Sequence, residues 1–439
     1  MVRNGLTRRS LLSLGIGAGA AATLAACGGD DGGDAGGEIS KEAVKLRFTW
    51  WGSDARHKRT QQAIDLFTKK YPNITVSGEF KEWNGYWDSL ATTVAANDAP
   101  DIIQMDELYL ASYAERGALL DLGEASKHLK TADFDEVVLA TGKVDGKQYA
   151  IPTGLTTYAI VANTDLLAQY KIPVPDDSTW TWDDLKRIGA EVSKASGGKV
   201  TGVQSWGFDS GGVNIWARQA GASLYDDAGK VAIPPDVLAS FWQYLLDLAK
   251  NGIAPAPSVT VERAGAPLDQ SGTATNTSAF GTWWSSQLPS LATASGQKLK
   301  LLKLPTNGQP AAADSPYYKP SMFWSISSRS KHPAEAAAFV DFLLNTTEAG
   351  DVLLTDRGIP SNTTVRSAIT PKLTENDKAV ADYLQSVKPG PAPRVTPNGA
   401  SSIETILKRH SEEVLFERQT PQQAAAGFIK ELQAEIDAA

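Results

Sequence analysis

The stretch LRFTWWGSDARHKRTQQAIDLFTKKYPNITV, Leu46–Val76, decides the fold class of this chain. It begins with apolar and polar side chains in alternation, which is typical of a half-buried strand. A helical pattern follows, with Ile64, Phe67 and Tyr71 on one face, and Pro72 ends it. The last residues of the stretch return to a strand pattern. A strand, a helix and a second strand in this order predict parallel strands joined by a crossover helix.

The same alternation of strands and helices continues along the chain. Asp101–Met105 is a short apolar strand, and the helix after it ends at Gly117, where a C-cap glycine fits. A second region repeats the pattern, with strands at Tyr149–Pro152 and Tyr158–Ala162 joined by Thr153-Gly154. We therefore predict the α/β class, with largely parallel, doubly wound sheets.

The first 38 residues indicate export. Residues 1–27 contain paired arginines, a short run of small and apolar residues, and a small-residue cleavage site before Cys27, which together make a secretory signal. The paired arginines resemble a twin-arginine signal, and the placement of Cys27 resembles the lipobox of bacterial lipoproteins. A chance cysteine after an ordinary signal is the alternative. Residues 28–38 are rich in glycine and aspartate and predict a flexible tether.

Composition excludes several other classes. The 439 residues carry a formal net charge of −8 and no basic run outside the signal, which argues against nucleic acid. No second long apolar run predicts a membrane span. The single cysteine excludes an internal disulfide, and the four scattered histidines predict neither a metal site nor a cofactor. Twelve tryptophans are the unusual feature, because large rings suit stacking.

Several segments together resemble the extracellular solute-binding proteins of bacterial sugar importers, the maltose-binding-like family 1. They are Leu46–Val76, Asn97–Leu122, Gly146–Leu167 with Thr179–Leu185, and His332–Asn362. The resemblance implies a two-lobed periplasmic-binding-protein fold of the type II kind, with sugar held in the cleft between two α/β lobes.

The resemblance also implies the bounds of the lobes. Lobe one would comprise residues 39–153 and 305–346, and lobe two residues 154–304 and 347–439. The crossings would lie near Thr153-Gly154, Pro305 and Thr346, at element boundaries where a hinge can absorb backbone rotation.

Candidate ligand-binding residues follow the ends of two predicted strands, where ligands of open α/β sheets lie. Asp106 and Glu107 end the third strand. Trp51 ends the first strand with the parity opposite to its apolar residues, so we expect it to stack on the ligand. Asp54 and Arg56 follow, since carboxylates and guanidinium groups suit paired sugar hydroxyls. Capping by Asp54 and a solvated Arg56 are the alternatives.

Aromatic rings and polar groups elsewhere complete the candidate site, because pyranose faces stack on rings while hydroxyls need polar partners. We expect one of the adjacent pair Trp283-Trp284 to lie in the core. The resemblance favours this pair and Arg357 as cleft residues. The further candidates are Trp83, Asn84, Trp206, Asp209, Trp216, Trp283, Trp284, Trp324 and Arg357.

These observations predict a monomeric, lipid-anchored receptor on the outer face of a bacterial cell membrane. It would bind a sugar, with an oligosaccharide as the expected ligand, and deliver it to the permease subunits of an ATP-driven importer. The sequence lacks a nucleophile elbow and a zinc-ligand pair, so we do not expect an enzyme. A secreted glycan-processing enzyme stays an alternative, because glycoside hydrolysis needs only two carboxylates. A receptor for a non-sugar solute is the second alternative.

Overall fold

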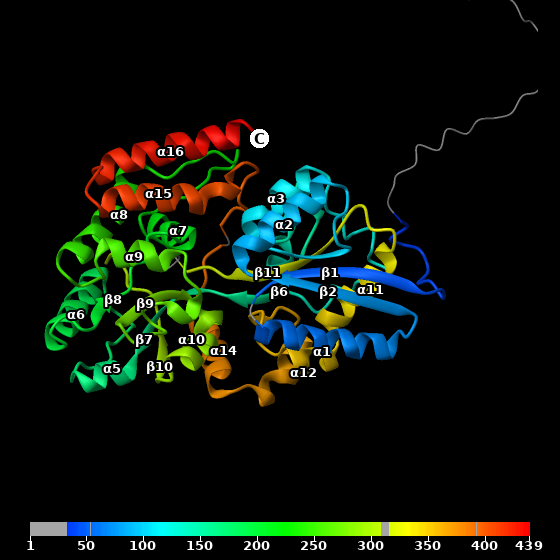
Figure 1. Ribbon diagram of the computed structural model, residues 1–439, viewed down its shortest axis with the longest axis horizontal. Coiled ribbons are helices and arrows are strands. Elements are labelled where there is room, and N and C mark those ends of the chain that lie inside the picture. Colours follow the sequence, from blue (N-terminus) through cyan, green and yellow to red (C-terminus); the bar gives the residue numbers. More distant parts are fainter. Residues whose placement is uncertain (1–32, 53, 309–315, 392) are drawn as a thin grey trace, which may run out of the picture. The chain divides into compact units, whose positions relative to one another are not determined.

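The computed structural model describes residues 33–52, 54–308, 316–391 and 393–439 (Figure 1). The predicted signal segment, Cys27 and residues 28–32 of the predicted tether lie outside the described residues. Within the described ranges, no helix has the length and apolar character needed to cross a membrane.

The first sheet has six strands in the order β12-β6-β11-β3-β1-β2. β1 runs parallel to β2 and β3, which confirms the strand–helix–strand unit predicted near the start of the chain. β11 comes from far along the chain and lies antiparallel between β3 and β6. The strands are β1 (Val44–Trp51), β2 (Ile74–Lys81), β3 (Ile102–Met105), β6 (Ile151–Thr156), β11 (Lys319–Ile326) and β12 (Ile359–Pro360).

Helices cover both faces of this sheet, and we call the sheet with its helices lobe one. In Figure 1, α2 and α3 lie on one face and α1 and α12 on the other. Phe48 and Trp50 pack on the side of α1, whereas Trp51 packs on the side of α2. The helices are α1 (Asp54–Lys70), α2 (Trp83–Ala95), α3 (Glu107–Glu115), α4 (Glu136–Ala140), α11 (Pro333–Asn345), α12 (Thr347–Leu353) and α13 (Thr363–Ile369). A small hairpin joins β4 (Lys143–Val144) and β5 (Lys147–Gln148).

The second sheet has four strands in the order β10-β7-β9-β8, and with its helices it forms lobe two. β7 is antiparallel to both of its neighbours, and only β8 and β9 pair in parallel. The α/β class is as predicted, but the expectation of largely parallel sheets is wrong here. Local patterns do not fix the direction in which a distant segment re-enters a sheet. The strands are β7 (Tyr158–Asn163), β8 (Thr201–Val203), β9 (Ser278–Trp284) and β10 (Leu299–Leu302).

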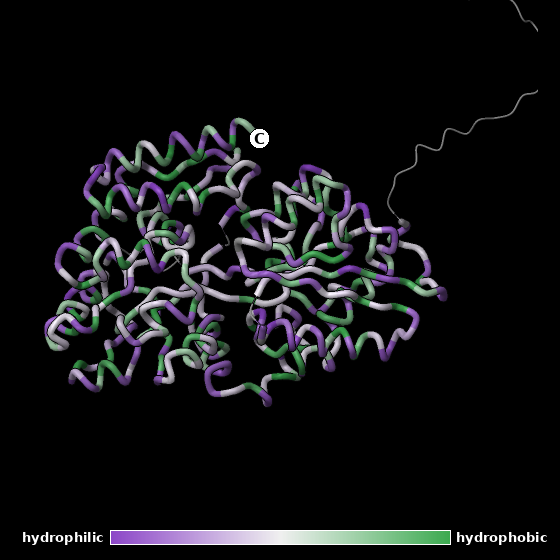
Figure 2. The backbone as a smooth tube through the Cα atoms, in the orientation of Figure 1, coloured by the Kyte–Doolittle hydropathy of each residue, from purple (hydrophilic) through white to green (hydrophobic). Residues whose placement is uncertain are grey.

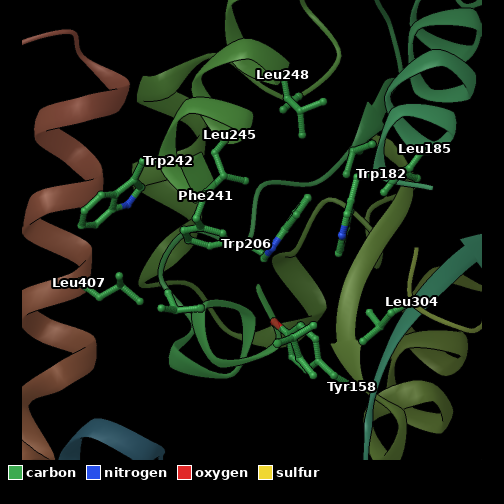
Figure 3. Close-up of a cluster of buried hydrophobic side chains, with 14 of the residues drawn as sticks. Tyr158, Trp182, Leu185, Trp206, Phe241, Trp242, Leu245, Leu248, Leu304 and Leu407 are labelled. Atoms are coloured by element: carbon green, nitrogen blue, oxygen red, sulfur yellow. The ribbon is translucent and has the colours of Figure 1, made fainter. Parts of the chain in front are cut away.

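The larger core of lobe two lies between its sheet and the outer helices. Figure 3 shows part of it, with Trp182 beside Trp206 and Trp242 facing α15. In Figure 2 the colour alternates along α15 and α16, as expected of helices with one buried face. The helices are α5 (Thr164–Gln169), α6 (Trp182–Ala195), α7 (Ser210–Gln219), α8 (Pro235–Lys250), α9 (Pro257–Ala264), α10 (Leu288–Ser295), α14 (Glu375–Ser386), α15 (Ile403–Leu415) and α16 (Pro421–Asp437).

The first connection between the lobes lies later than Thr153-Gly154. Both residues are inside β6, which continues to Thr156, so the chain changes sheet at Thr157. Gly154 has a packing role, because a Cβ at this position would overlap the backbone carbonyl of Arg357. The glycine therefore marks a close approach of two backbone segments rather than a turn between strands.

The third connection also lies later than predicted, beyond Thr346. β12 pairs with β6 and α12 packs against α1, so both belong with lobe one. α14 packs against α10 and β10 of lobe two. The chain therefore changes lobe between Ile369 and Glu375.

The described part of the predicted tether is packed on lobe one. The Gly33 N–H donates to the Ser330 carbonyl at 3.0 Å, and a ring nitrogen of His128 lies 2.6 Å from the Gly37 carbonyl oxygen. Ala35 is 4% exposed and belongs to the core between this segment and the sheet. The prediction of a flexible tether is thus wrong for residues 33–38, because their backbone groups find partners that the sequence does not reveal.

Candidate functional site

A pocket of about 230 Å³ lies between α3 of lobe one and α7 of lobe two. Glu107 and Leu108 of α3 line one side of it. Asn214 and Arg218 of α7 line another, and Tyr317 lies where the chain returns toward β11. Its volume falls slightly below the ~300–1,000 Å³ that is usual for small-molecule sites. Because both lobes supply its walls, this pocket is the candidate binding site.

Asp106 and Asp209 begin the two helices as N-caps. Asp106 Oδ1 accepts a hydrogen bond from the Leu108 N–H at 3.1 Å. Asp209 Oδ1 accepts one from the Gly211 N–H at 2.7 Å, and its Oδ2 accepts one from the Tyr158 hydroxyl at 3.1 Å. A capping carboxylate satisfies a backbone donor that has no partner within the helix. Both predicted site residues therefore hold the helices that line the pocket.

Lys319, at the start of β11, neutralises part of this acidic region. Its Nζ lies 3.2 Å from Asp106 Oδ2 and 3.6 Å from Glu107 Oε1. The Lys319 side chain is 11% exposed and that of Asp106 is 7% exposed, so the pair is largely removed from water. The Lys319 ammonium also lies 5.4 Å from the centre of the Trp284 ring, within the range of a cation–π contact.

The carboxyl groups around Lys319 share one electrostatic environment. Burial raises the pKa of Glu107 to about 7, with Lys319 opposing the shift and Asp106 adding to it. Burial and the charges of Asp209 and Asp106 together raise the pKa of Glu404 on α15 to about 8. Burial opposes the charged form of Lys319, but the neighbouring carboxylates hold its pKa above the usual value. Mutual repulsion of the buried carboxylates therefore raises the pKa of the carboxyl groups, and their attraction for Lys319 raises the pKa of its ammonium group.

An aromatic corner lies next to Lys319. The Trp284 ring is 4.7 Å from the Tyr158 ring and 6.1 Å from the Tyr317 ring, both in edge-to-face geometry. Gly211 lies against Trp284, and a Cβ there would come within 2.5 Å of the indole. Trp283 points elsewhere, since its Nε1–H donates to Thr273 Oγ1 at 2.9 Å and its ring packs on another cluster. Trp284 is therefore the member of the pair that packs against the pocket-lining residues Gly211 and Tyr317.

Burial corrects the expectation of ligand stacking for three tryptophans. Trp51 is 8% exposed and lies among Trp83, Tyr86 and Trp87. Trp206 is 5% exposed and stacks on Trp182, with ring centres 5.6 Å apart (Figure 3). Trp324 is 1% exposed and packs on Phe48. The prediction for Trp51 fails because β1 is a central strand whose two faces are both covered, so neither parity faces a ligand.

The predicted arginines make ion pairs and hydrogen bonds within lobe one. Arg56 Nε donates to Asp356 Oδ2 at 3.0 Å, which excludes the alternative of a solvated side chain. Arg357 is 4% exposed, its Nε donates to Gln104 Oε1 at 2.9 Å, and burial lowers its pKa to about 9. Asp54 is an exposed residue in the first turn of α1. None of these three lines the pocket between α3 and α7.

Two further candidates, Trp83 and Trp216, lie apart from the pocket lining. Trp83 is half-buried, with its ring 5.0 Å from Trp51 and 6.3 Å from Tyr109. Trp216 packs on Trp182 within lobe two, and its Nε1–H donates to Ser240 Oγ at 2.9 Å. The side chain of Asn84 lies outside the described residues. A binding role for Trp83 and Asn84 stays a prediction.

Sequence reasoning missed several residues of the site. Lys319 could have been noticed as a charged residue at the start of an otherwise apolar strand. Tyr317 holds Asn214, whose Nδ2–H donates to its hydroxyl at 3.4 Å, and Arg218 lies over its ring at 5.3 Å. Tyr225 lines the same pocket. These residues come from segments far apart in sequence, and no local sequence pattern predicts that they lie close together.

Two curated proteins are similar in sequence to parts of this chain. A diacetylchitobiose-binding protein, DasA of Streptomyces coelicolor, is 29% identical over 191 residues, which is 43% of this chain and 44% of that protein. An arabinooligosaccharide-binding protein of Bacillus subtilis is 24% identical over 225 residues, covering 50% of this chain and 51% of the relative. The chain thus spans about half the length of the curated relatives it matches.

Solved structures share the whole fold. An extracellular solute-binding protein of family 1 from Alicyclobacillus acidocaldarius is 31% identical, and the match covers 90% of this chain and 99% of the other with a TM-score of 0.64. A periplasmic oligogalacturonide-binding protein from Yersinia enterocolitica, solved with digalacturonic acid, has the same fold, with a TM-score of 0.80 at 24% identity over 90% of this chain and 99% of that one.

Residues 62–381 match the family of bacterial extracellular solute-binding proteins. Members of such a family work outside the cytoplasm, so the chain is exported. Among the described residues, no group of three or more histidine, cysteine, aspartate or glutamate side chains is placed to hold a metal ion. The matched segment covers well over half of the chain, and the protein therefore belongs to the bacterial extracellular solute-binding proteins.

Proposed function

We propose that this protein is the sugar receptor of an ATP-driven importer and that it binds an oligosaccharide between α3 and α7. The observation that carries this proposal is the pocket whose polar walls come from both lobes, with Glu107 on one side and Asn214 on the other. A solute that contacts both lobes gains contacts only when they are close together, so it favours the closed arrangement. A permease that binds the closed arrangement preferentially would then distinguish the loaded receptor from the empty one.

The chemistry of the pocket supports a sugar as the solute. Carboxylate, amide and phenol groups suit sugar hydroxyls, and Tyr317, with Trp284 packed against its ring, brings an aromatic ring to the pocket lining. The relatives that bind diacetylchitobiose and arabino-oligosaccharides also support a carbohydrate ligand. Receptor function rather than catalysis fits the carboxylates, because Asp106 and Asp209 are engaged in helix caps.

The remaining parts of the proposal concern the setting of the receptor. Permease subunits are the expected partners, and we propose that the receptor acts as a monomer. Attachment of lipid at Cys27 would hold the exported chain at the outer face of the cell membrane, since several acyl chains bind a bilayer firmly.

A thermal-shift screen tests the proposed function. The purified protein would be heated with neutral oligosaccharides, including diacetylchitobiose and arabino-oligosaccharides, and with free amino acids as the control solutes. A sugar present at 100 times its Kd should add about 2.7 kcal/mol to the free energy of unfolding. A clear rise in Tm with a sugar supports the proposal. No rise with any sugar at millimolar concentration, or glycan turnover by the protein, overturns it.

A further inference from the structure

The pocket region contains more carboxylates than cations. Asp106, Glu107, Asp209 and Glu404 act on one another electrostatically, as their shared influence on the pKa of Glu404 shows. Lys319 is the cation within this group. When all of these groups are ionised, the region holds a surplus of negative charge.

The arginines that line the pocket reduce this surplus without removing it. Arg394 pairs with Asp227 at 3.2 Å, so these two residues cancel. Arg218 lies over the Tyr317 ring, and its Nη2–H donates to the Pro391 carbonyl at 2.9 Å. Among the described residues, Arg218 and Lys319 offset two of the four carboxylates, and burial keeps the pKa of Glu107 and of Glu404 high.

Glu107 is the carboxylate with capacity for a ligand. Asp106 and Asp209 accept capping hydrogen bonds, and Asp106 also takes the shorter contact to Lys319. Glu107 lines the pocket, and its ion pair with Lys319 is longer, at 3.6 Å. A positively charged donor in the pocket could therefore bind Glu107 without breaking an existing short contact.

An independent feature also points to a ligand. Tyr225 is 7% exposed and lines the same pocket, and its hydroxyl has no hydrogen-bond partner among the described residues. Glu107 lines this pocket too, and burial together with the Glu107 charge raises the pKa of Tyr225. Buried polar atoms are almost always hydrogen-bonded, so an unpartnered hydroxyl at a pocket wall indicates a polar guest.

We propose that the pocket prefers a sugar bearing a free ammonium group, which Glu107 binds, while Tyr225 meets an adjacent hydroxyl. This inference rests on the proposed function and narrows its substrate class. A cation beside Glu107 favours the ionised form of this carboxyl group, and its hydrogen bond to a carboxylate is stronger than one between neutral groups. A uronic acid would bring a like charge into the same region and is disfavoured.

Isothermal titration calorimetry near neutral pH tests the preference with three disaccharides. The probes are the glucosamine disaccharide, its diacetylated form, which lacks the charge, and digalacturonic acid. We expect the amine to bind about tenfold more tightly than the diacetylated form, which corresponds to about 1.4 kcal/mol. We expect digalacturonic acid to bind least tightly of the three.

Variants assign the preference to named groups. Glu107→Gln should bring the two chitobiose affinities close together. Glu115→Gln is the matched control, because Glu115 is an exposed carboxylate of the same helix that does not line the pocket, and it should keep the tenfold ratio. Tyr225→Phe should weaken both sugars by a similar factor without changing that ratio. The Tm of each variant is measured alongside. If Glu107→Gln fails to fold, the wild-type ratio is measured near pH 5 instead, where protonation of Glu107 should bring the two affinities together.

The outcomes separate this inference from the proposed function. Equal affinities for the amine and its diacetylated form in the wild-type protein, or tightest binding of digalacturonic acid, overturn the preference and leave a sugar receptor. An unchanged ratio in Glu107→Gln overturns the role of Glu107. Failure of every sugar in the screen to bind overturns the proposed function itself.

Discussion

Lys319 Nζ lies 3.2 Å from Asp106 Oδ2 and so ties the start of β11 to the N-terminus of α3. The two residues are 213 positions apart in sequence, and their side chains are 11% and 7% exposed. Asp106 also caps α3, the helix that presents Glu107 to the pocket. One ion pair therefore fixes the position of a pocket wall.

Removal of this cation should be costly. Lys319→Met leaves Asp106 in a site that is largely removed from water, and loss of one partner of a buried pair costs about 3–5 kcal/mol. Urea unfolding should show a loss of this order. The double variant Lys319→Met with Asp106→Asn should recover part of it, since no unpaired charge then remains at Asp106. A single-variant loss below about 1 kcal/mol would show that water reaches the pair.

Trp51 and Trp284 should respond in opposite ways to truncation. Trp51→Ala opens a cavity among Trp83, Tyr86 and Trp87, and it should cost about 3–5 kcal/mol of stability. Trp284 is half-buried beside Lys319, so Trp284→Ala should lower sugar affinity more than stability. Urea unfolding and calorimetry on both variants check the contrast. Equal affinity losses with equal stability losses would remove Trp284 from the site.

The burial of Glu404 should appear as a pH-dependent stability. Its pKa is raised to about 8 from 4.5, so the folded protein holds a proton that the unfolded chain releases between these values. Stability therefore falls as the pH rises from about 4.5 to about 8. Glu404→Gln should match the wild-type Tm at pH values near 4.5 and exceed it above 8. Identical pH profiles for the two proteins would mean that Glu404 is solvated.

Cys27 provides a test of the membrane anchor. The residue ends a signal-like segment and is the only cysteine of the chain. Cys27→Ala should leave an unprocessed precursor or release the protein to the medium, as seen by fractionation of cells. Cys27 variants that stay membrane-bound at mature size would contradict lipid attachment at this residue.

Local patterns predicted the elements of the fold better than the places where those elements meet. The Leu46–Val76 stretch indicates a parallel strand pair because alternation, helix period and Pro72 act locally. Trp51 was assigned to the ligand by parity, which fails where helices cover both faces of a sheet. The sequence predicts a hinge near Gly154, whereas the close approach of the Arg357 backbone is what requires a glycine at this position.

The site itself depends on contacts between distant segments. Asp106, Glu107 and Asp209 were found because they follow strand ends or a glycine-rich loop, which are local features. Lys319 and Tyr225 were missed, since their importance arises from neighbours far away in sequence. The resemblance predicts Arg357 as a cleft residue, but the three acceptors of its guanidinium group are all within lobe one.

Small-angle X-ray scattering with and without sugar tests whether the ligand joins the two lobes. A solute that contacts Glu107 on one lobe and Asn214 on the other stabilises their close approach, so it must shift the population toward the closed form. Saturating sugar should therefore lower the radius of gyration of the purified protein. An unchanged radius with a sugar that demonstrably binds would place the ligand on one lobe or in a rigid pocket, and the receptor mechanism would be wrong.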